Sequence, residues 1–315
     1  MARIKMQDHS RKTLDAAFQE FMTFKRINNL SKDSLNFYED VFKVFGMYHD
    51  TGQLCESVTK DTVYGYIEHL QKRETLKDVT INSYLRGIRV ALYYFMEMGY
   101  MEKFVIKLIK CDKEIKETYT NEELERLLKK PDVSKVRFSE YRNWVLVNYL
   151  LGTGNRLKTL VNLKWADVDF HNDMIRLSTT KNRKQQLIPL SSTLKGVLKE
   201  YRTYRKGDED DFVFCNQYGQ QIGKAGVETA IQRYNSQRGI TKRSVHLFRH
   251  TFAKLWILNG GDIFRLQKIL GHSNLDMVKE YVSMFSTDLQ QDFDTFNPLE
   301  NITVNHKKSS IRLKK

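Results

Sequence analysis

The sequence has few cysteines, few prolines and no long apolar segment. Its three cysteines, Cys55, Cys111 and Cys215, are widely separated and form no CxxC pair, so neither a disulfide framework nor a zinc site is indicated. Only three prolines occur, which favours a mostly helical chain with few rigid linkers. No apolar run approaches membrane-spanning length, and the opening MARIKMQDHSRK lacks the apolar core of a secretory signal. We therefore expect a soluble, cytoplasmic protein with no membrane partner.

Acidic residues are outnumbered by basic ones. The chain has 52 Lys and Arg residues against 38 Asp and Glu, which gives a net charge of +14 and a pI near 9.5. Such an excess favours polyanionic partners, with DNA or RNA ahead of an acidic membrane, because Lys and Arg displace condensed counterions from phosphates. We expect a protein associated with the nucleoid.

The first third of the sequence predicts a compact domain of four amphipathic helices, at residues 1–111. The first helix begins near Thr13, the second follows Ser34 and the third begins near Thr59. The fourth and longest stretch carries an apolar stripe, made of Ile81, Tyr84, Leu85, Ile88, Leu92 and Phe95. Arg86 lies away from this stripe and Arg89 lies on its flank.

A polar stretch without periodicity, CDKEIKETYT, predicts an interdomain linker at residues 112–118, before a capping box of Thr120 and Glu123. Residues 119–300 predict a second domain, in which a helix broken by Gly152 and Gly154 precedes the strand-like runs DVDF, MIRLS and QLIPLS. The chain is then predicted helical through Tyr281, and residues 301–315 form a basic tail. The fold class expected is mainly α with a small antiparallel β-sheet.

Histidine and arginine share one face of the helix predicted for VHLFRHTFAK. At 100° per residue, His246, Arg249 and His250 gather around Ala253, opposite an apolar face made of Phe248, Phe252, Leu255 and Trp256. A solvated face would ordinarily carry Lys and Glu, so this composition suggests a pocket for an anion. Taken alone, the helix is equally described by a solvated or locally paired surface.

Four further positions accompany this helix. Arg156 stands at a helix start after the glycines, where exposed N–H groups favour an anion. Lys181 lies in a basic hairpin, His272 follows Gly271 at a predicted helix C-cap, and Tyr281 lies nine residues beyond His272. Each has a plain alternative: a surface arginine, a hairpin lysine, a capping histidine and a core tyrosine.

Taken together, the order and spacing of these residues resemble the tyrosine recombinases, also called the phage integrase family. The matching stretches are GTGNRLKTLVNLKWADVD, TKNRKQQLIPL and HLFRHTFAKLWILNGGDIFRLQKILGHSNLDMVKEYV. The resemblance covers essentially the whole chain, since that family places a helical DNA-binding domain before its catalytic domain. It implies a two-domain, C-shaped clamp on DNA and strand exchange through a covalent phosphotyrosine, with no metal or other cofactor.

The resemblance also implies a role for each residue. Tyr281 attacks the scissile phosphodiester and forms a 3′-phosphotyrosyl link. Arg156 and Arg249 neutralise the non-bridging oxygens, to one of which His272 also donates. Lys181 is the general acid for the leaving 5′-oxygen, with Lys184 as its competitor. His246 binds the phosphate or accepts the proton of the tyrosine, and His250 is a structural support. The candidate phosphate contacts in the first domain are Lys60, Arg86 and Arg89.

Two departures from the family pattern stand out. The family usually has an acidic residue three positions after the first arginine, and here that position holds Thr159, which leaves the support of Arg156 unassigned. Gln186 stands where the family often has an arginine before the final strand. Lys181 is preferred to Lys184 because its distance from Pro189 matches the family's spacing.

The implied partners are double-stranded DNA with inverted-repeat core sites and a homo-tetramer on two duplexes, with a directionality factor or partner recombinase as further candidates. Little chain precedes the first helix, so we expect no arm-binding domain and a recombinase of the Xer-like or transposon-encoded sort. Two alternatives stay open: a type IB-like topoisomerase, and a non-catalytic DNA-binding protein on a recombinase fold.

Overall fold

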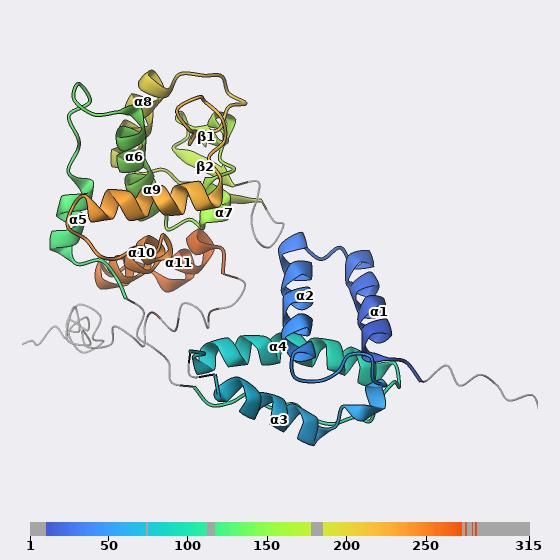
Figure 1. The fold of residues 1–315 in the computed structure, drawn as a ribbon. Helices are drawn as coiled ribbons and strands as arrows, with labels where there is room; N and C mark the ends of the chain where they lie inside the picture. Colours follow the sequence, from blue (N-terminus) through green and yellow to red (C-terminus); the bar gives the residue numbers. More distant parts are fainter. Residues whose placement is uncertain are drawn as a thin grey trace, which may run out of the picture. The chain divides into compact units, whose positions relative to one another are not determined.

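A computed structural model describes residues 11–73, 75–111, 117–177 and 185–272, together with residues 275, 279 and 281. The chain divides into two compact units, Met1–Glu114 and Ile115–Lys315, each with a hydrophobic core of its own (Figure 1). The division falls within residues 112–118, for which the sequence predicts the linker, although residues 112–116 and the predicted tail 301–315 lie outside the described residues. None of the described helices is long and apolar enough to cross a membrane.

The described residues of the first unit form four α-helices: α1 (Leu14–Ile27), α2 (Lys32–Gly46), α3 (Lys60–Gln71) and α4 (Asp78–Glu97). Three of them begin at a hydroxyl residue whose oxygen accepts a backbone N–H of the first turn, namely Thr13, Ser31 and Thr59. The predicted stripe of α4 is largely buried, with Leu85, Leu92 and Phe95 fully enclosed. The four helices predicted from periodicity are therefore confirmed, with α2 beginning slightly earlier than expected.

The end of the first unit is fastened to α4 by a buried asparagine. The Asn82 side chain donates to the carbonyl of Ile109 (2.9 Å) and accepts the N–H of the same residue (3.0 Å). The Tyr93 hydroxyl accepts the N–H of Ile106 at 3.1 Å. These bonds satisfy backbone groups of Ile106 and Ile109, which belong to no described helix or strand.

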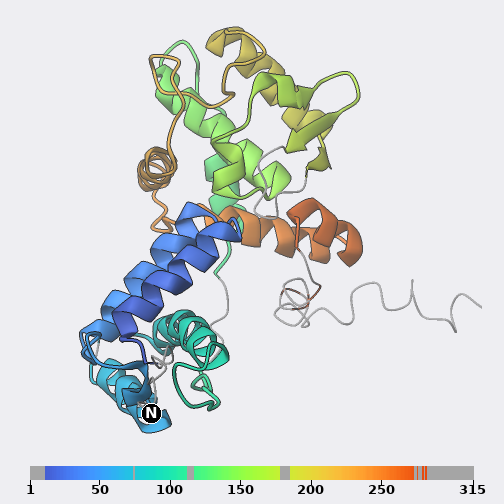
Figure 2. The same ribbon diagram turned by 90° about the vertical axis from the view of Figure 1, so that its right-hand side faces the viewer.

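The second unit surrounds helix α6 (Phe138–Thr153), which contacts α5, α8, α9 and α10. Those neighbours are α5 (Asn121–Leu128), α8 (Ser192–Arg205), α9 (Lys224–Ser236) and α10 (His246–Leu258). Because it is covered on all sides, α6 buries side chains around its whole circumference, including Val145, Leu146 and Tyr149. Helix α11 (Ile263–Leu270) lies beside α10 (Figures 1 and 2).

A small antiparallel sheet has the strand order β1 (Val168–Asp169), β2 (Met174–Leu177) and β3 (Gln186–Pro189). The first residue of β3, Gln186, is paired with Leu177, the last residue of β2. The predicted basic hairpin joins these two strands, and its residues 178–184 lie outside the described residues. The predicted fold class, mainly α with a small antiparallel sheet, is confirmed.

Two details of the second unit differ from expectation. Gly152 does not break the helix, because α6 continues through Thr153 and ends only at Gly154, which adopts the left-handed conformation that glycine favours (φ 60°). A Cβ at Gly154 would lie 2.7 Å from a ring carbon of Phe252, so α10 closely approaches this C-cap. The chain after β3 is also less uniformly helical than predicted, since an irregular stretch separates α8 from α9.

Candidate active site

Helix α10 is buried on two sides, which turns its predicted anion-binding face inward. Phe248 is fully buried in the main core of the second unit, whereas Ala253 is fully buried in a smaller cluster with Leu266, Leu270 and Tyr281. Arg249 lies between these two cores and is only 5% exposed. The simple alternative of a solvated surface is therefore wrong for Arg249.

The Arg249 guanidinium is held by backbone carbonyls at two helix ends. It donates to the carbonyl of Gly154 at the end of α6 (2.9 Å) and to that of Leu270 at the end of α11 (2.8 Å). It also lies 2.6 Å from Nε2 of His272. The last carbonyls of a helix have no partner within the helix and bear partial negative charge, so they orient a cation without neutralising it.

A second guanidinium converges on the same carbonyl. Arg156 occupies the N-cap of the short helix α7 (Leu157–Leu160) and donates to the carbonyl of Leu270 at 3.3 Å. Burial lowers the pKa of both arginines, to about 10 for Arg249, where the charge of Arg156 contributes further. Among the described residues, neither arginine has a carboxylate partner. The structure thus gathers positive charge that an anion would stabilise.

The candidate nucleophile lies beside these two arginines. Tyr281 is 1% exposed, and its hydroxyl lies 2.7 Å from Nδ1 of His250. The Tyr281 side chain packs in the same buried cluster as Leu270, whose carbonyl receives both guanidiniums. Five of the predicted site residues therefore gather in one place: Arg156, Arg249, His250, His272 and Tyr281.

The other predicted site residues lie elsewhere or are not described. His246 is exposed one turn before His250, with 6.1 Å between the two ring centroids. Lys181 and Lys184 fall within residues 178–184, outside the described residues, so the choice between them stays a prediction. In the first unit, Lys60 and Arg86 are exposed and Arg89 is partly exposed. The Lys60 ammonium lies 5.5 Å from the centre of the Tyr64 ring.

Sequence reasoning missed two elements of the site. One is the carbonyl of Leu270, which receives both guanidiniums and, as a backbone group, leaves no signal in the sequence. The other is the side chain of Gln186, whose Nε2 donates to the carbonyls of Lys268 (2.5 Å) and Ile269 (2.8 Å). Its only sequence signal is its departure from the family's usual arginine.

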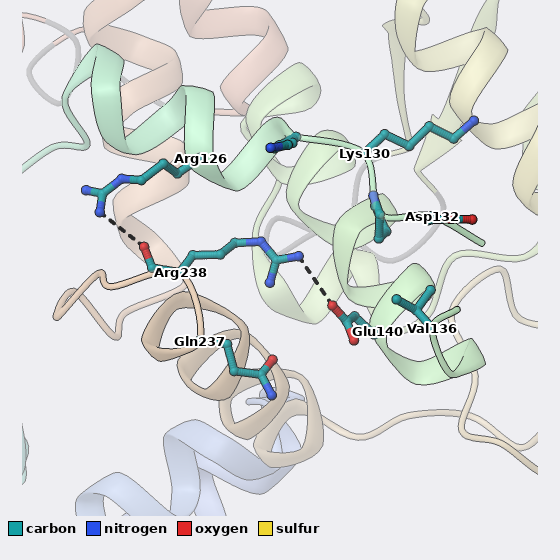
Figure 3. Close-up of a pocket in the computed structure, with 9 residues that line it drawn as sticks. Arg126, Lys130, Asp132, Val136, Glu140, Gln237 and Arg238 are labelled. Atoms are coloured by element: carbon teal, nitrogen blue, oxygen red, sulfur yellow. Dashed lines mark hydrogen bonds and ion pairs between the residues drawn. The ribbon is translucent and has the colours of Figure 1, made fainter. Parts of the chain in front are cut away.

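A separate hollow of about 650 Å³ opens between α5, the start of α6 and the end of α9 (Figure 3). In it, Arg126 donates to the carbonyl of Arg238, whose own guanidinium lies 3.5 Å from Glu140. The lining mixes both signs of charge and consists of Arg126, Lys129, Lys130, Pro131, Asp132, Val136, Glu140, Gln237 and Arg238. Within the described part of the chain, no group of three or more His, Cys, Asp or Glu side chains could hold a metal ion.

Comparisons with known proteins agree with this geometry. Residues 117–287 match the Phage integrase family, and residues 13–113 match the Phage integrase SAM-like domain. Tyrosine recombinase XerD of Listeria monocytogenes is 26% identical over 294 residues, which cover 89% of this chain and 97% of that protein.

Two solved structures share the fold. The Tn1549 transposon integrase in complex with transposon right end DNA is 19% identical with a TM-score of 0.71, over 89% of this chain and 99% of that one. A lambda integrase tetramer bound to a Holliday junction is 15% identical with a TM-score of 0.69, over 86% and 81% of the two chains.

The two-unit fold and the tyrosine, arginine and histidine cluster define a tyrosine recombinase. Because the family match spans more than half of the chain, this chain belongs to the phage integrase family. It is accordingly a site-specific DNA recombination enzyme, as its match to XerD also indicates.

Proposed function

We propose that this recombinase cuts and rejoins double-stranded DNA at core sites with inverted repeats, using Tyr281 as the nucleophile. The observation that carries the proposal is the convergence of two buried guanidiniums and the Tyr281 hydroxyl at the end of α11. A phosphodiester is the anion that suits such a site, because phosphoryl transfer spreads negative charge over the non-bridging oxygens. The phenol would supply the attacking oxygen.

The reaction balances without an external energy source. The Tyr281 oxygen forms a bond to phosphorus while the bond from phosphorus to the 5′-oxygen breaks, which gives a 3′-phosphotyrosine and a free 5′-hydroxyl. The intermediate retains a phosphodiester, so the attack of another 5′-hydroxyl reseals the strand. Resealing with the strand of a second duplex is recombination.

Arg156 and Arg249 are proposed to bind the non-bridging oxygens. Their planar donors suit a tetrahedral phosphate, and their carbonyl partners fix them before DNA arrives, so little reorganisation is needed during the reaction. His272, 2.6 Å from Arg249, is proposed to donate to one of the same oxygens. The lowered pKa of Arg249 favours this role, because an arriving phosphate relieves the cost of the two neighbouring charges.

The proton of Tyr281 is proposed to pass to His250. Its Nδ1 lies 2.7 Å from the phenolic oxygen, which is within reach for a general base. His246 is then proposed to contact the phosphate, one of the two roles that the sequence suggested. The leaving 5′-oxygen takes its proton from Lys181, with Lys184 as the competing candidate.

The proposed assembly is a tetramer on two duplexes. Its support is the likeness in fold to the lambda integrase tetramer on a Holliday junction. A directionality factor or a partner recombinase belongs to the same proposal. A type IB topoisomerase and a non-catalytic DNA-binding protein are not favoured, since the matched relative is itself a recombinase.

The test uses nicked duplexes cut from the DNA that flanks the gene, in which loss of a short fragment after cleavage prevents resealing. The wild-type enzyme should form a detergent-resistant protein–DNA adduct in the presence of EDTA. Tyr281→Phe should form none, whereas Tyr218→Phe, which alters a tyrosine that is 77% exposed, should react like the wild type. An adduct that persists in Tyr281→Phe would disprove the assignment of the nucleophile.

A further inference from the structure

The last carbonyls of α11 are each used by a side chain from another element. Those of Lys268 and Ile269 accept Nε2 of Gln186, at 2.5 and 2.8 Å. The next carbonyl, that of Leu270, accepts Arg249 at 2.8 Å and Arg156 at 3.3 Å. Helix ends leave such groups without partners inside the helix, so the donors that reach them fix how the helix terminates.

Gln186 also lies directly against the turn that follows. Gly271 adopts the left-handed conformation (φ 62°), and a Cβ at this position would lie 2.7 Å from Oε1 of Gln186. The backbone of Gln186 is held by its antiparallel pairing with Leu177. A side-chain donor whose backbone is anchored in the sheet therefore holds the end of α11, at the turn that leads to His272.

We propose that Gln186 is a positioning residue for the phosphate-binding arginines and His272. It touches no reacting group in this arrangement; it acts by fixing the Leu270 carbonyl, from which both guanidiniums take their direction. His272 follows two residues later and contacts Arg249 at 2.6 Å. This inference rests on the proposed function, because it assumes that these three side chains bind the scissile phosphate.

The sharpest variants separate hydrogen bonding from shape. Gln186→Glu keeps the size of the side chain but sets a carboxylate against two carbonyls, whereas Gln186→Arg retains donors for them. Gln186→Ala removes the contact altogether. Gln185→Ala alters an exposed neighbouring glutamine and serves as the matched control.

The measurement is the single-turnover cleavage rate at saturating DNA, together with DNA affinity and the melting temperature followed by tryptophan fluorescence. Gln186→Ala and Gln186→Glu should lose roughly 10- to 100-fold in rate, as expected when catalytic donors are misplaced by about an ångström. Their DNA affinity should stay within about twofold, because most phosphate contacts lie outside this turn. Gln186→Arg should recover most of the rate, and Gln185→Ala should match the wild type.

A double-variant cycle with Arg156→Lys tests whether Gln186 acts through the arginines. If it does, Gln186→Ala should cost much less rate in the Arg156→Lys background than in the wild type. The inference would be overturned if the rate losses of the two single variants multiply in the double variant. An unchanged rate in Gln186→Ala, or a loss of DNA affinity equal to its loss of rate, would also overturn it. In each of those cases the proposed function would still stand if the wild type forms the protein–DNA adduct and Tyr281→Phe does not. A wild type that forms no adduct would overturn both the proposed function and the inference about Gln186.

Discussion

His250 is the residue whose position adds most to the sequence motif. Both histidines of HLFRH are candidates to accept the tyrosine proton, and only geometry distinguishes them: Nδ1 of His250 is 2.7 Å from the Tyr281 hydroxyl, whereas His246 is exposed one turn away. The family resemblance implied either a phosphate contact or proton acceptance for His246, and a structural role for His250. Residues four apart share a helix face, so spacing alone could not choose between them.

His250→Gln should slow cleavage by roughly 100-fold or more, since glutamine keeps a polar group near the phenol but accepts no proton at neutral pH. Single-turnover cleavage rates at saturating DNA measure the effect.

His246→Gln is the control for this prediction. It should lose less rate than His250→Gln. The reverse pattern would assign proton acceptance to His246, one of the two roles that the resemblance implied for it, and make His250 a structural residue.

Among the elements, local signals predicted helices and strands well and long-range contacts poorly. The capping box of Thr120 and Glu123 opens α5 as expected, and Gly271 ends α11 in the left-handed conformation. These features depend on neighbours within a few residues, which a sequence displays directly. The break predicted at Gly152 was an error of relying on local signals alone. Glycine is a weak helix former, but here its conformation depends on the contacts that α6 makes with the rest of the second unit.

The geometry of the site depends instead on segments far apart in the chain. The Leu270 carbonyl gathers donors from α7 and α10, and Gln186 reaches α11 from the sheet. The family motif predicted which side chains meet, since Arg156, Arg249, His272 and Tyr281 are in its pattern. It could not predict the backbone groups that hold them, because every residue has a backbone carbonyl and the residue type does not show which carbonyl is used.

Helix α5 offers a pH-dependent test at the scale of one element. The Glu123 carboxylate accepts the N–H of Thr120 at 2.8 Å and binds the ammonium of Lys242, which also donates to the carbonyl of Thr118. Burial alone would raise the pKa of Glu123, but Lys242 and the backbone N–H outweigh it and hold this pKa below its usual 4.5. The chain entering the second unit is thus tied to the loop before α10.

Glu123→Gln should destabilise the second unit by about 1.5 to 3 kcal/mol at pH 7, the usual range for a hydrogen bond to a charged group. Because the folded-state pKa is depressed, the stabilisation is complete above pH 4.5 and is lost as the pH falls through the folded value. The difference between wild type and variant should therefore narrow as the pH falls below 4.5.

Urea unfolding followed by tryptophan fluorescence isolates this effect, since Trp144, Trp165 and Trp256 all lie in the second unit. Glu125→Gln, on the exposed side of the same helix, should behave like the wild type at both ends of the pH range. A difference in stability that does not change with falling pH would mean that Lys242 does not hold the Glu123 carboxylate in its charged form.

At the scale of the whole molecule, we expect DNA binding and DNA cleavage to depend on different parts of the chain. The two units have separate cores, and the described site residues around Tyr281 all lie in the second unit. The first unit is proposed to contribute DNA binding, and the +14 charge of the chain favours long-range attraction to DNA. The DNA affinity and the cleavage rate at saturating DNA should therefore change with different substitutions.

Replacing Lys60, Arg86 and Arg89 together by alanine should weaken DNA binding and make it less sensitive to salt, with little change in the cleavage rate at saturating DNA. Each lost phosphate contact lowers the slope of log affinity against log salt by about 0.9 on duplex DNA, so three contacts predict a change of about 2.7. Fluorescence anisotropy on a labelled core site between about 50 and 200 mM salt measures the slope.

The matched control removes the same charge elsewhere on the first unit, at the exposed residues Lys32, Lys43 and Lys103. A general loss of attraction would weaken both triple variants at low salt, but only loss of direct phosphate contacts changes the slope by the larger amount. Equal slopes for the two variants would show that Lys60, Arg86 and Arg89 form a solvated surface. The DNA contacts of the first unit would then have to come from other side chains.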